Sequence, residues 1–181
     1  MTPAFDHSIR MAVHARASPA LTAAMRGVSM IGEPAVLIVA GFAAALWLLR
    51  TRKGPTALLF ATILAGAEIL DQLLKLAFHR PRPAVFFGLA EPMGYSFPSG
   101  HSLVSFAFFG ALALFAAPRR WWYFLAAAVP IAAIGFSRVY LGMHYPSDVL
   151  GGWATGAVWL LVVRLAIRGR DGDSTLGSGG H

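Results

Sequence analysis

The stretch YSFPSGHSLVSFAFFG, residues 95–110, places a short polar group at the head of a run that is otherwise almost entirely apolar. Pro98, Ser99 and Gly100 are ordinary residues for the start of a helix, and His101 follows them in the first turn. A histidine at such a position can be purely structural. Its meaning depends on which other polar residues the chain brings to the same end of its apolar segments.

The composition is that of a membrane protein. Of the 181 residues, 57% are hydrophobic and 13% are charged, whereas soluble domains carry about 25% charged residues. The mean hydropathy is +0.63. The chain has no cysteine, which excludes disulfide bonds and thiolate metal ligands. These features predict one integral membrane domain.

The net charge of +7 does not indicate a nucleic-acid-binding protein. The basic residues fall in short clusters between apolar runs, without the basic stripe and interleaved aromatic residues of such proteins. Clusters of this kind orient membrane helices, because cytoplasmic loops are rich in lysine and arginine. If the segments alternate in direction, most of these cations share one face, which is predicted to be cytoplasmic: Arg50, Arg52, Lys53, Arg119, Arg120, Arg164, Arg168 and Arg170.

Five apolar segments predict an all-α fold, a polytopic transmembrane helix bundle, because lipid offers no partner for open backbone groups. The segments cover about Pro34–Leu49, Thr56–Phe78, Ser99–Ala117, Trp121–Phe136 and Ser147–Ile167.

The two ends of the chain differ from this bundle. Residues 1–31 carry a narrow apolar stripe at helical spacing, which predicts an amphipathic helix lying in the membrane interface, with a mobile tail as the alternative. Residues 32–168 form the predicted transmembrane domain. Residues 169–181 are polar and rich in glycine and serine, and are predicted to be a disordered tail.

Three blocks of polar residues fall on the face opposite the cytoplasmic clusters: KLAFHRPRP at 75–83, PSGH at 98–101 and SRVYLGMHYPSD at 137–148. Lys75, Arg82 and Arg138 would repel one another unless a polyanion bound them, and arginine matches phosphate oxygens well. The backbone amides of Ser99 and Gly100 add the anion-binding start of a helix. Together these groups predict a phosphate cradle without a metal ion.

The remaining polar residues suggest chemistry on that phosphate. His144 and Asp148 are four residues apart around Pro146, a favoured first residue of a helix. The carboxylate can therefore reach one ring nitrogen and leave the other as a nucleophile. His101 comes from another helix on the same face and can protonate a leaving oxygen.

This set of motifs resembles the type-2 phosphatidic acid phosphatase (PAP2) family. That family includes bacterial undecaprenyl-diphosphate phosphatases and lipid A phosphatases and is related to vanadium haloperoxidases. The resemblance spans roughly residues 20–168. Every position of K-x6-R-P, P-S-G-H and S-R-x5-H-x3-D is filled in this sequence: Lys75, Arg82, Pro83, Pro98, Ser99, Gly100, His101, Ser137, Arg138, His144 and Asp148.

The resemblance implies a PAP2/haloperoxidase-like core and a role for each site residue. His144 would be the nucleophile that forms a phosphohistidine, Asp148 would support it, and His101 would be the general acid. No metal ion or other cofactor is implied. The phosphoryl oxygens would be held by Lys75, Arg82, Ser99, Gly100 and Arg138.

Each motif alone has an ordinary interpretation. PSGH can be a plain helix start, the His144–Asp148 pair a surface ion pair, and the basic block a patch for anionic headgroups. Three blocks on one predicted face favour the phosphatase instead. The competing functions are a vanadate-dependent haloperoxidase, whose known examples are soluble, and a transporter or flippase that only binds a lipid headgroup.

Other charged residues near these blocks are given structural interpretations. Asp71 is expected to pair with Lys75 four residues later, and Glu68 to bond to a neighbouring helix. Neither His79 nor Arg80 is assigned a catalytic role.

We therefore predict a multi-pass lipid phosphatase of a bacterial-type inner membrane, with its site on the periplasmic or extracytoplasmic face. The expected substrate is a membrane lipid with a phosphate or diphosphate headgroup: undecaprenyl diphosphate, phosphatidylglycerol phosphate, phosphatidate or lipid A. Apart from this substrate and the bilayer, no partner is predicted.

Overall fold

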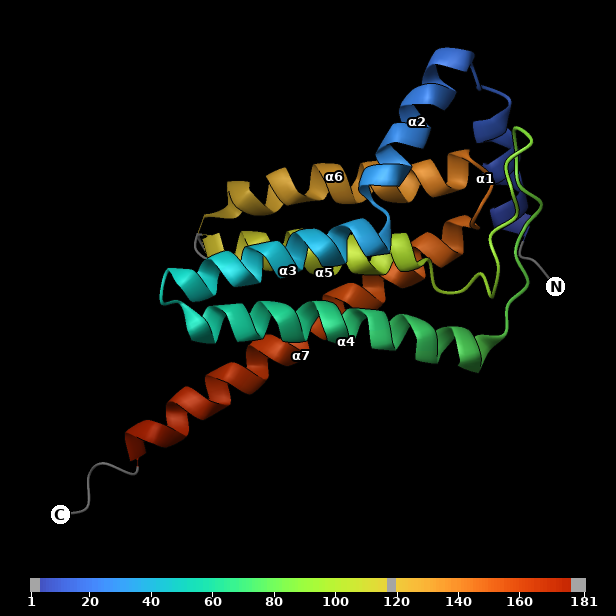
Figure 1. The fold of residues 1–181 in the computed structure, drawn as a ribbon. Helices are drawn as coiled ribbons and strands as arrows, with labels where there is room; N and C mark the ends of the chain where they lie inside the picture. The colour runs from blue at the N-terminus through green and yellow to red at the C-terminus, as the bar shows by residue number, and fades with distance from the viewer. Residues whose placement is uncertain (1–3, 117–119, 177–181) are drawn as a thin grey trace.

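The computed structural model describes residues 4–116 and 120–176, with side chains as far as residue 167. All regular structure in these residues is helical, as the sequence predicts (Figure 1). The helices are α1 (Ala4–His14), α2 (Pro19–Ile31), α3 (Pro34–Arg50), α4 (Gly54–Phe78), α5 (Gly100–Ala116), α6 (Trp121–Tyr140) and α7 (Pro146–Leu176).

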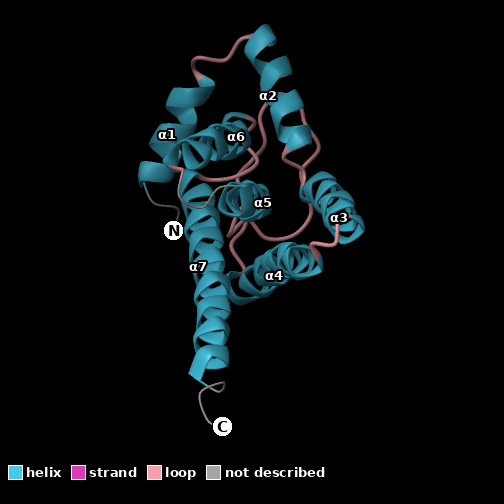
Figure 2. Cartoon of the chain, turned by 90° about the vertical axis from the view of Figure 1, so that its left-hand side faces the viewer, coloured by secondary structure: helices cyan, strands magenta, loops and turns pink. Residues whose placement is uncertain are grey.

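Helix α5 is the centre of the bundle. Figure 2 shows it surrounded by α3, α4, α6 and α7. Two glycines of α7 allow α5 to approach closely. A Cβ atom at Gly152 would lie 2.7 Å from the carbonyl oxygen of Ser99, and one at Gly156 would lie 2.9 Å from Cβ of Phe106. The buried apolar core gathers around α5 and includes Phe60, Ile63, Leu103, Val104, Ala107 and Ala111.

The helices are suited to a bilayer. By length and apolar composition, α4, α6 and residues 146–167 of α7 can each cross a membrane, and α2 with α3 forms a pair bent by 46° that qualifies together. Helix α5 has 17 residues and is a shorter apolar helix. Large apolar side chains such as Val39, Phe42 and Leu58 are exposed on the outside of the bundle, where lipid would cover them.

The N-terminal segment consists of two helices rather than one. Ser18 starts α2, because its Oγ accepts a hydrogen bond from the Leu21 amide over 3.3 Å. Helix α1 contacts α6 and α7, and its Asp6 and Arg10 are buried.

At its C-terminal end the chain continues as helix α7 to Leu176, beyond the domain boundary predicted at residue 168. The last five residues of the predicted disordered tail, 177–181, lie outside the described residues. The helix can extend because nothing in 169–176 is a proline, although glycine lowers its propensity.

The long α4–α5 connection and the α6–α7 turn lie at one end of the bundle. Figure 1 shows the 79–99 segment, the turn between α6 and α7, and α1 at the end opposite the α3–α4 turn. The three polar blocks therefore share one end, as the alternation of segments predicts.

Candidate active site

A cavity of about 640 Å³ lies at this end of the bundle. Six of the predicted site residues line it: Lys75, Arg82, Gly100, His101, Arg138 and His144. They come from α4, α5, α6 and the connections between helices. A second groove of about 530 Å³, between α5, α6 and α7, is almost entirely apolar and contains none of the predicted site residues.

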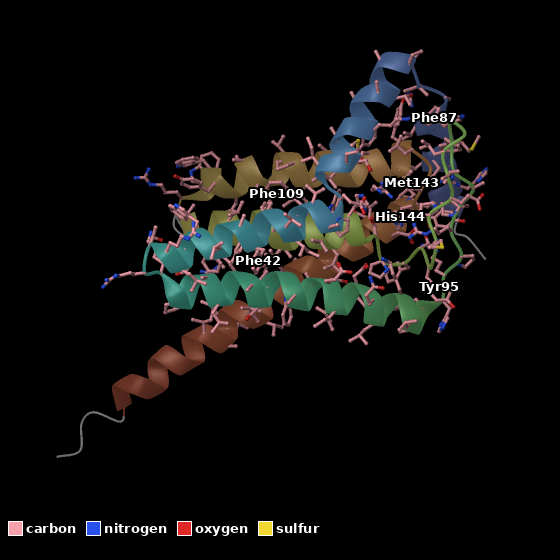
Figure 3. All side chains as sticks on the ribbon, viewed as in Figure 1. Phe42, Phe87, Tyr95, Phe109, Met143 and His144 are labelled. Carbon is pink, nitrogen blue, oxygen red and sulfur yellow. The ribbon has the colours of Figure 1, made fainter. Side chains whose placement is uncertain are left out.

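His144 lies in the turn between α6 and α7, near Met143 and at the same end as Phe87 and Tyr95 (Figure 3). Its ring is buried, with Nε2 3.1 Å from Nη1 of Arg82 and Nδ1 3.4 Å from Oδ2 of Asp148. Arginine can only donate, so Nε2 must accept and the hydrogen lies on Nδ1. The ring nitrogen beside Arg82 is therefore the unprotonated one, and its lone pair accepts the Arg82 hydrogen bond.

Burial also keeps this imidazole neutral. Desolvation lowers the pKa of His144 to about 3, against the opposing effect of Asp148. A neutral ring whose hydrogen faces a carboxylate is the form that a nucleophile requires.

Asp148 is fully buried in the first turn of α7. Its Oδ2 accepts the backbone N–H of Tyr145 over 2.8 Å and the hydroxyl of Ser96. Its Oδ1 accepts Nη1 of Arg80 over 2.6 Å. The 3.4 Å contact with His144 is longer than a normal hydrogen bond, and such contacts often tighten only when substrate binds.

His101 faces a carboxylate that the sequence analysis did not identify. Its Nε2 lies 2.9 Å from Oε2 of Glu33, which occupies the break between α2 and α3 and also lines the cavity. The only signal in the sequence is an isolated acidic residue directly before Pro34, where the apolar segment begins. His101 and His144 thus each have a carboxylate neighbour, Glu33 from the α2–α3 break and Asp148 from α7.

The three cations are held in place by different partners. Lys75 forms the predicted ion pair with Asp71, and Arg138 donates to the hydroxyl of Ser29. Arg82 donates from Nε to the Gly94 carbonyl and from Nη1 to the Met143 carbonyl, each over 3.2 Å. Arg82 therefore links the 79–99 segment to the turn between α6 and α7.

Glu68 differs from its expected role. It accepts a hydrogen bond from Gln72 of its own helix over 2.8 Å, not from a neighbouring helix. Glu68, Asp71 and Gln72 all line the cavity.

The Ser99 amide has a protein partner in this structure, so its predicted role in binding phosphate stays a prediction. Its N–H donates to the backbone carbonyl of Asp148 over 3.0 Å, and its fully buried hydroxyl accepts from Ser102. The start of α5 packs against the first turn of α7, which uses this amide. Gly100 does line the cavity, and a Cβ there would lie 2.9 Å from Oδ2 of Asp71.

Across the described ranges, no three histidine, aspartate or glutamate side chains gather as a set of metal ligands. The groups that can hold a ligand are the cations and the Gly100 end of α5, which suit an anion. Two histidines and three cations around one cavity, in a bundle with an apolar exterior, define a membrane-bound enzyme of phosphoryl transfer.

Comparison with known proteins identifies the family. The model of the PAP2 superfamily matches residues 55–171, and the chain belongs to that superfamily. The prediction of a PAP2-type integral membrane phosphatase is confirmed.

Three relatives illustrate the match. Phosphatidylglycerophosphatase B of Bacillus subtilis is 28% identical, over 88% of this chain and 81% of that protein. Lipid A 1-phosphatase of Rhizobium johnstonii is 41% identical over 60% of this chain, which spans only 46% of that protein. The crystal structure of a transmembrane PAP2-type phosphatidylglycerolphosphate phosphatase from Bacillus subtilis has a TM-score of 0.75 and 28% identity, over 90% of this chain and 84% of that one.

Proposed function

We propose that this protein hydrolyses the phosphate monoester or diphosphate of a membrane lipid, without a metal ion, through a phosphohistidine intermediate. One observation carries the proposal: His101 of α5 and His144 of the α6–α7 turn line a single cavity with Lys75, Arg82 and Arg138.

In the first step the bound phosphate draws Nη1 of Arg82 to one of its oxygens, which frees the lone pair on Nε2 of His144 to attack the phosphorus atom. A P–N bond forms as the P–O bond to the lipid breaks, and the imidazolium of His101 gives its proton to the departing oxygen. Lys75, Arg82 and Arg138 stabilise the charge on the remaining phosphoryl oxygens. The hydrogen on Nδ1 of His144 faces Asp148, whose carboxylate stabilises the positive charge that develops on the ring.

In the second step water attacks the phosphorus atom of the phosphohistidine. His101, now neutral, accepts a proton from the water, while the P–N bond breaks and His144 returns to its neutral form. Inorganic phosphate then leaves, and both histidines have regained their starting protonation.

Glu33 supports the first step. Its carboxylate lies 2.9 Å from the His101 ring, so its negative charge partly offsets burial, which disfavours the protonated imidazole that a general acid needs. Glu33 is also half exposed, so it can retreat when a leaving group enters.

The walls of the cavity suit an amphiphile. Its α3 side includes Pro34, Ala35 and Ile38, and its α4 side includes Glu68 and Gln72. A lipid headgroup would bind among the charged residues while its tails remain beside the apolar outer surface of the bundle. The relatives named for phosphatidylglycerophosphate and lipid A are consistent with such a substrate.

The orientation follows from the charged loops. The Arg50–Lys53 turn lies at the end opposite the cavity, and the positive-inside rule puts this turn in the cytoplasm. We therefore place the cavity on the extracytoplasmic face of the inner membrane. A reporter fused within residues 84–97 would read external, whereas a cytoplasmic reading would contradict this orientation.

The test of the activity is phosphate release in detergent with excess EDTA. The substrates are phosphatidylglycerol phosphate, phosphatidate, undecaprenyl diphosphate and lipid A. We expect release from at least one of them, near-complete loss in His144→Ala, and no loss in His7→Ala, since His7 is exposed on α1. Equal release by the wild type and His144→Ala would refute the role of His144. A transporter would release no phosphate, and a haloperoxidase would be active only with added vanadate and peroxide.

A further inference from the structure

The N-terminal helix α1 places one fully buried carboxylate beside the catalytic end of α7. Oδ1 of Asp6 accepts the backbone N–H of Ser147 over 2.9 Å. Oδ2 accepts the Ser147 hydroxyl over 2.6 Å and Nη2 of Arg80 over 2.7 Å. Because the first amides of a helix have no partner within it, Asp6 caps α7 from a distant part of the chain.

Arg80 connects this carboxylate to the catalytic one. Its Nη2 binds Asp6 and its Nη1 binds Oδ1 of Asp148 over 2.6 Å, so one guanidinium joins two buried carboxylates. The guanidinium also lies over the ring of Tyr145, 4.3 Å from its centre. A planar fork can hold two acceptors in fixed directions, which an ammonium group cannot do.

The charges of this cluster are maintained. Burial would raise the pKa of Asp6, but hydrogen bonds from Ser147 and Arg80 outweigh it and hold the pKa below its ordinary value. The pKa of Arg80 is raised, since Asp6 and Asp148 outweigh the effect of its burial. Asp6 is therefore an anion whenever the enzyme is folded near neutral pH.

Arg10, a second residue of α1, binds both the 79–99 segment and the turn between α6 and α7. Nη2 of Arg10 donates to the Ala84 carbonyl over 2.7 Å and to the Gly142 carbonyl over 3.3 Å. Its guanidinium lies 4.8 Å from the centre of the Phe86 ring. Helix α1 is thus bound to the 79–99 segment and to the turn that carries the nucleophile.

We propose that Asp6 is a positioning residue for the reaction, which acts through Arg80 and Ser147 to hold the Asp148 carboxylate against His144. This inference rests on the proposed function. It makes α1 a part of the catalytic unit and not only a contact with the membrane surface.

Asp6 is expected to affect the chemical step and not the binding of phosphate. Within the described residues, Lys75, Arg82 and Arg138 make no hydrogen bond to Asp6, Arg80 or Ser147. Loss of the Asp6 carboxylate should therefore leave the phosphate cradle in place and disturb the Asp148–His144 contact. We expect kcat to fall, while KM and the inhibition constant of inorganic phosphate change little.

The experiment compares Asp6→Asn with His7→Asn, a change at the neighbouring exposed position of α1. Purified full-length variants are checked for an unaltered thermal unfolding profile and assayed on the best lipid substrate. Asp6→Asn should lower kcat about 10- to 100-fold, the range known for partners that orient metal-ligating side chains, whereas His7→Asn should match the wild type. Unchanged kcat in Asp6→Asn would overturn the proposal, as would a change confined to KM.

A double-mutant cycle distinguishes positioning from a general loss of structure. If Asp6 acts through Asp148, Asp6→Asn should lower kcat less than about threefold in an Asp148→Asn enzyme. An equal fall in both backgrounds would overturn this inference alone. An Asp148→Asn enzyme with normal kcat would overturn the proposed function as well.

Arg80→Lys provides an independent variant if Asp6→Asn does not fold. It keeps the cation but loses the fork, so it should also lower kcat with little change in KM. Wild-type kcat in Arg80→Lys would overturn the connection between Asp6 and Asp148.

Discussion

Arg82 donates a hydrogen bond from Nη1 to Nε2 of His144 over 3.1 Å. This contact fixes which ring nitrogen carries the hydrogen, because the guanidinium has no lone pair to offer. The same arginine lines the cavity and is one of three cations that can hold phosphoryl oxygens. In the proposed reaction, one residue therefore orients the nucleophile and binds the group that it attacks.

Arg82→Lys should impair the enzyme although it keeps the charge. Lysine cannot reproduce the bonds to Gly94, Met143 and His144. Losing a charge-assisted hydrogen bond costs about 1.5–3 kcal/mol, which is roughly a 10- to 150-fold fall in kcat/KM. Arg50→Lys, at the exposed opposite end of the bundle, is the matched control. Equal kcat/KM in the two variants would show that the fork of Arg82 is not used.

Asp148→Asn should lower kcat on the order of 10²- to 10⁴-fold, as in other enzymes where a carboxylate fixes the tautomer of a catalytic histidine. The asparagine amide could present a donor to Nδ1 of His144 and place the hydrogen on the wrong nitrogen. Steady-state kinetics on the preferred lipid tests this. A fall in apparent affinity without a fall in kcat would assign Asp148 to binding.

The pH dependence of His144 follows from its burial, which lowers its pKa to about 3. The folded protein should keep this ring neutral, with the hydrogen on Nδ1, from about pH 8 to about pH 5, whereas a free imidazole titrates near 6.5. Because the unfolded chain binds the proton first, the contribution of His144 to stability is present above about pH 6.5 and is lost as the pH falls toward its folded value.

Nitrogen NMR of histidine-labelled protein in detergent micelles measures this directly, with His144→Gln to assign the signal. A ring that titrates near pH 6.5 in the unliganded protein would contradict the prediction.

His101→Gln should slow the release of poor leaving groups most. A general acid contributes about 10²- to 10⁴-fold when the departing oxygen is a lipid alkoxide. A substrate analogue with a nitrophenyl leaving group needs no proton and should lose far less activity. Glu33→Gln should give the same pattern in a weaker form. Equal losses on both substrates would assign His101 to phosphate binding instead.

Much of the fold could be predicted from the sequence. The five apolar segments correspond to α3–α7, because apolar length and Gly/Pro punctuation are local properties of the chain. The convergence of Lys75, His101 and His144 was predictable too, since alternating spans bring every second connection to the same end.

Other features depend on contacts between distant segments and leave little trace in the sequence. Asp6, Arg80 and Asp148 form one cluster only because α1 folds over both connections. The amide of Ser99 has the usual position of an anion ligand, yet the packing of α5 against α7 gives it to a carbonyl. Glu33 reaches His101 through the bend between α2 and α3, which periodicity does not predict.

The stereochemical course at phosphorus tests the central claim most directly. A lipid phosphorothioate made chiral with oxygen isotopes is hydrolysed in isotopically labelled water, and the configuration of the released thiophosphate is determined. Attack by His144 followed by attack by water inverts the centre twice, so the account predicts overall retention. Overall inversion would mean that water attacks the lipid phosphate directly, and would contradict a phosphohistidine on His144.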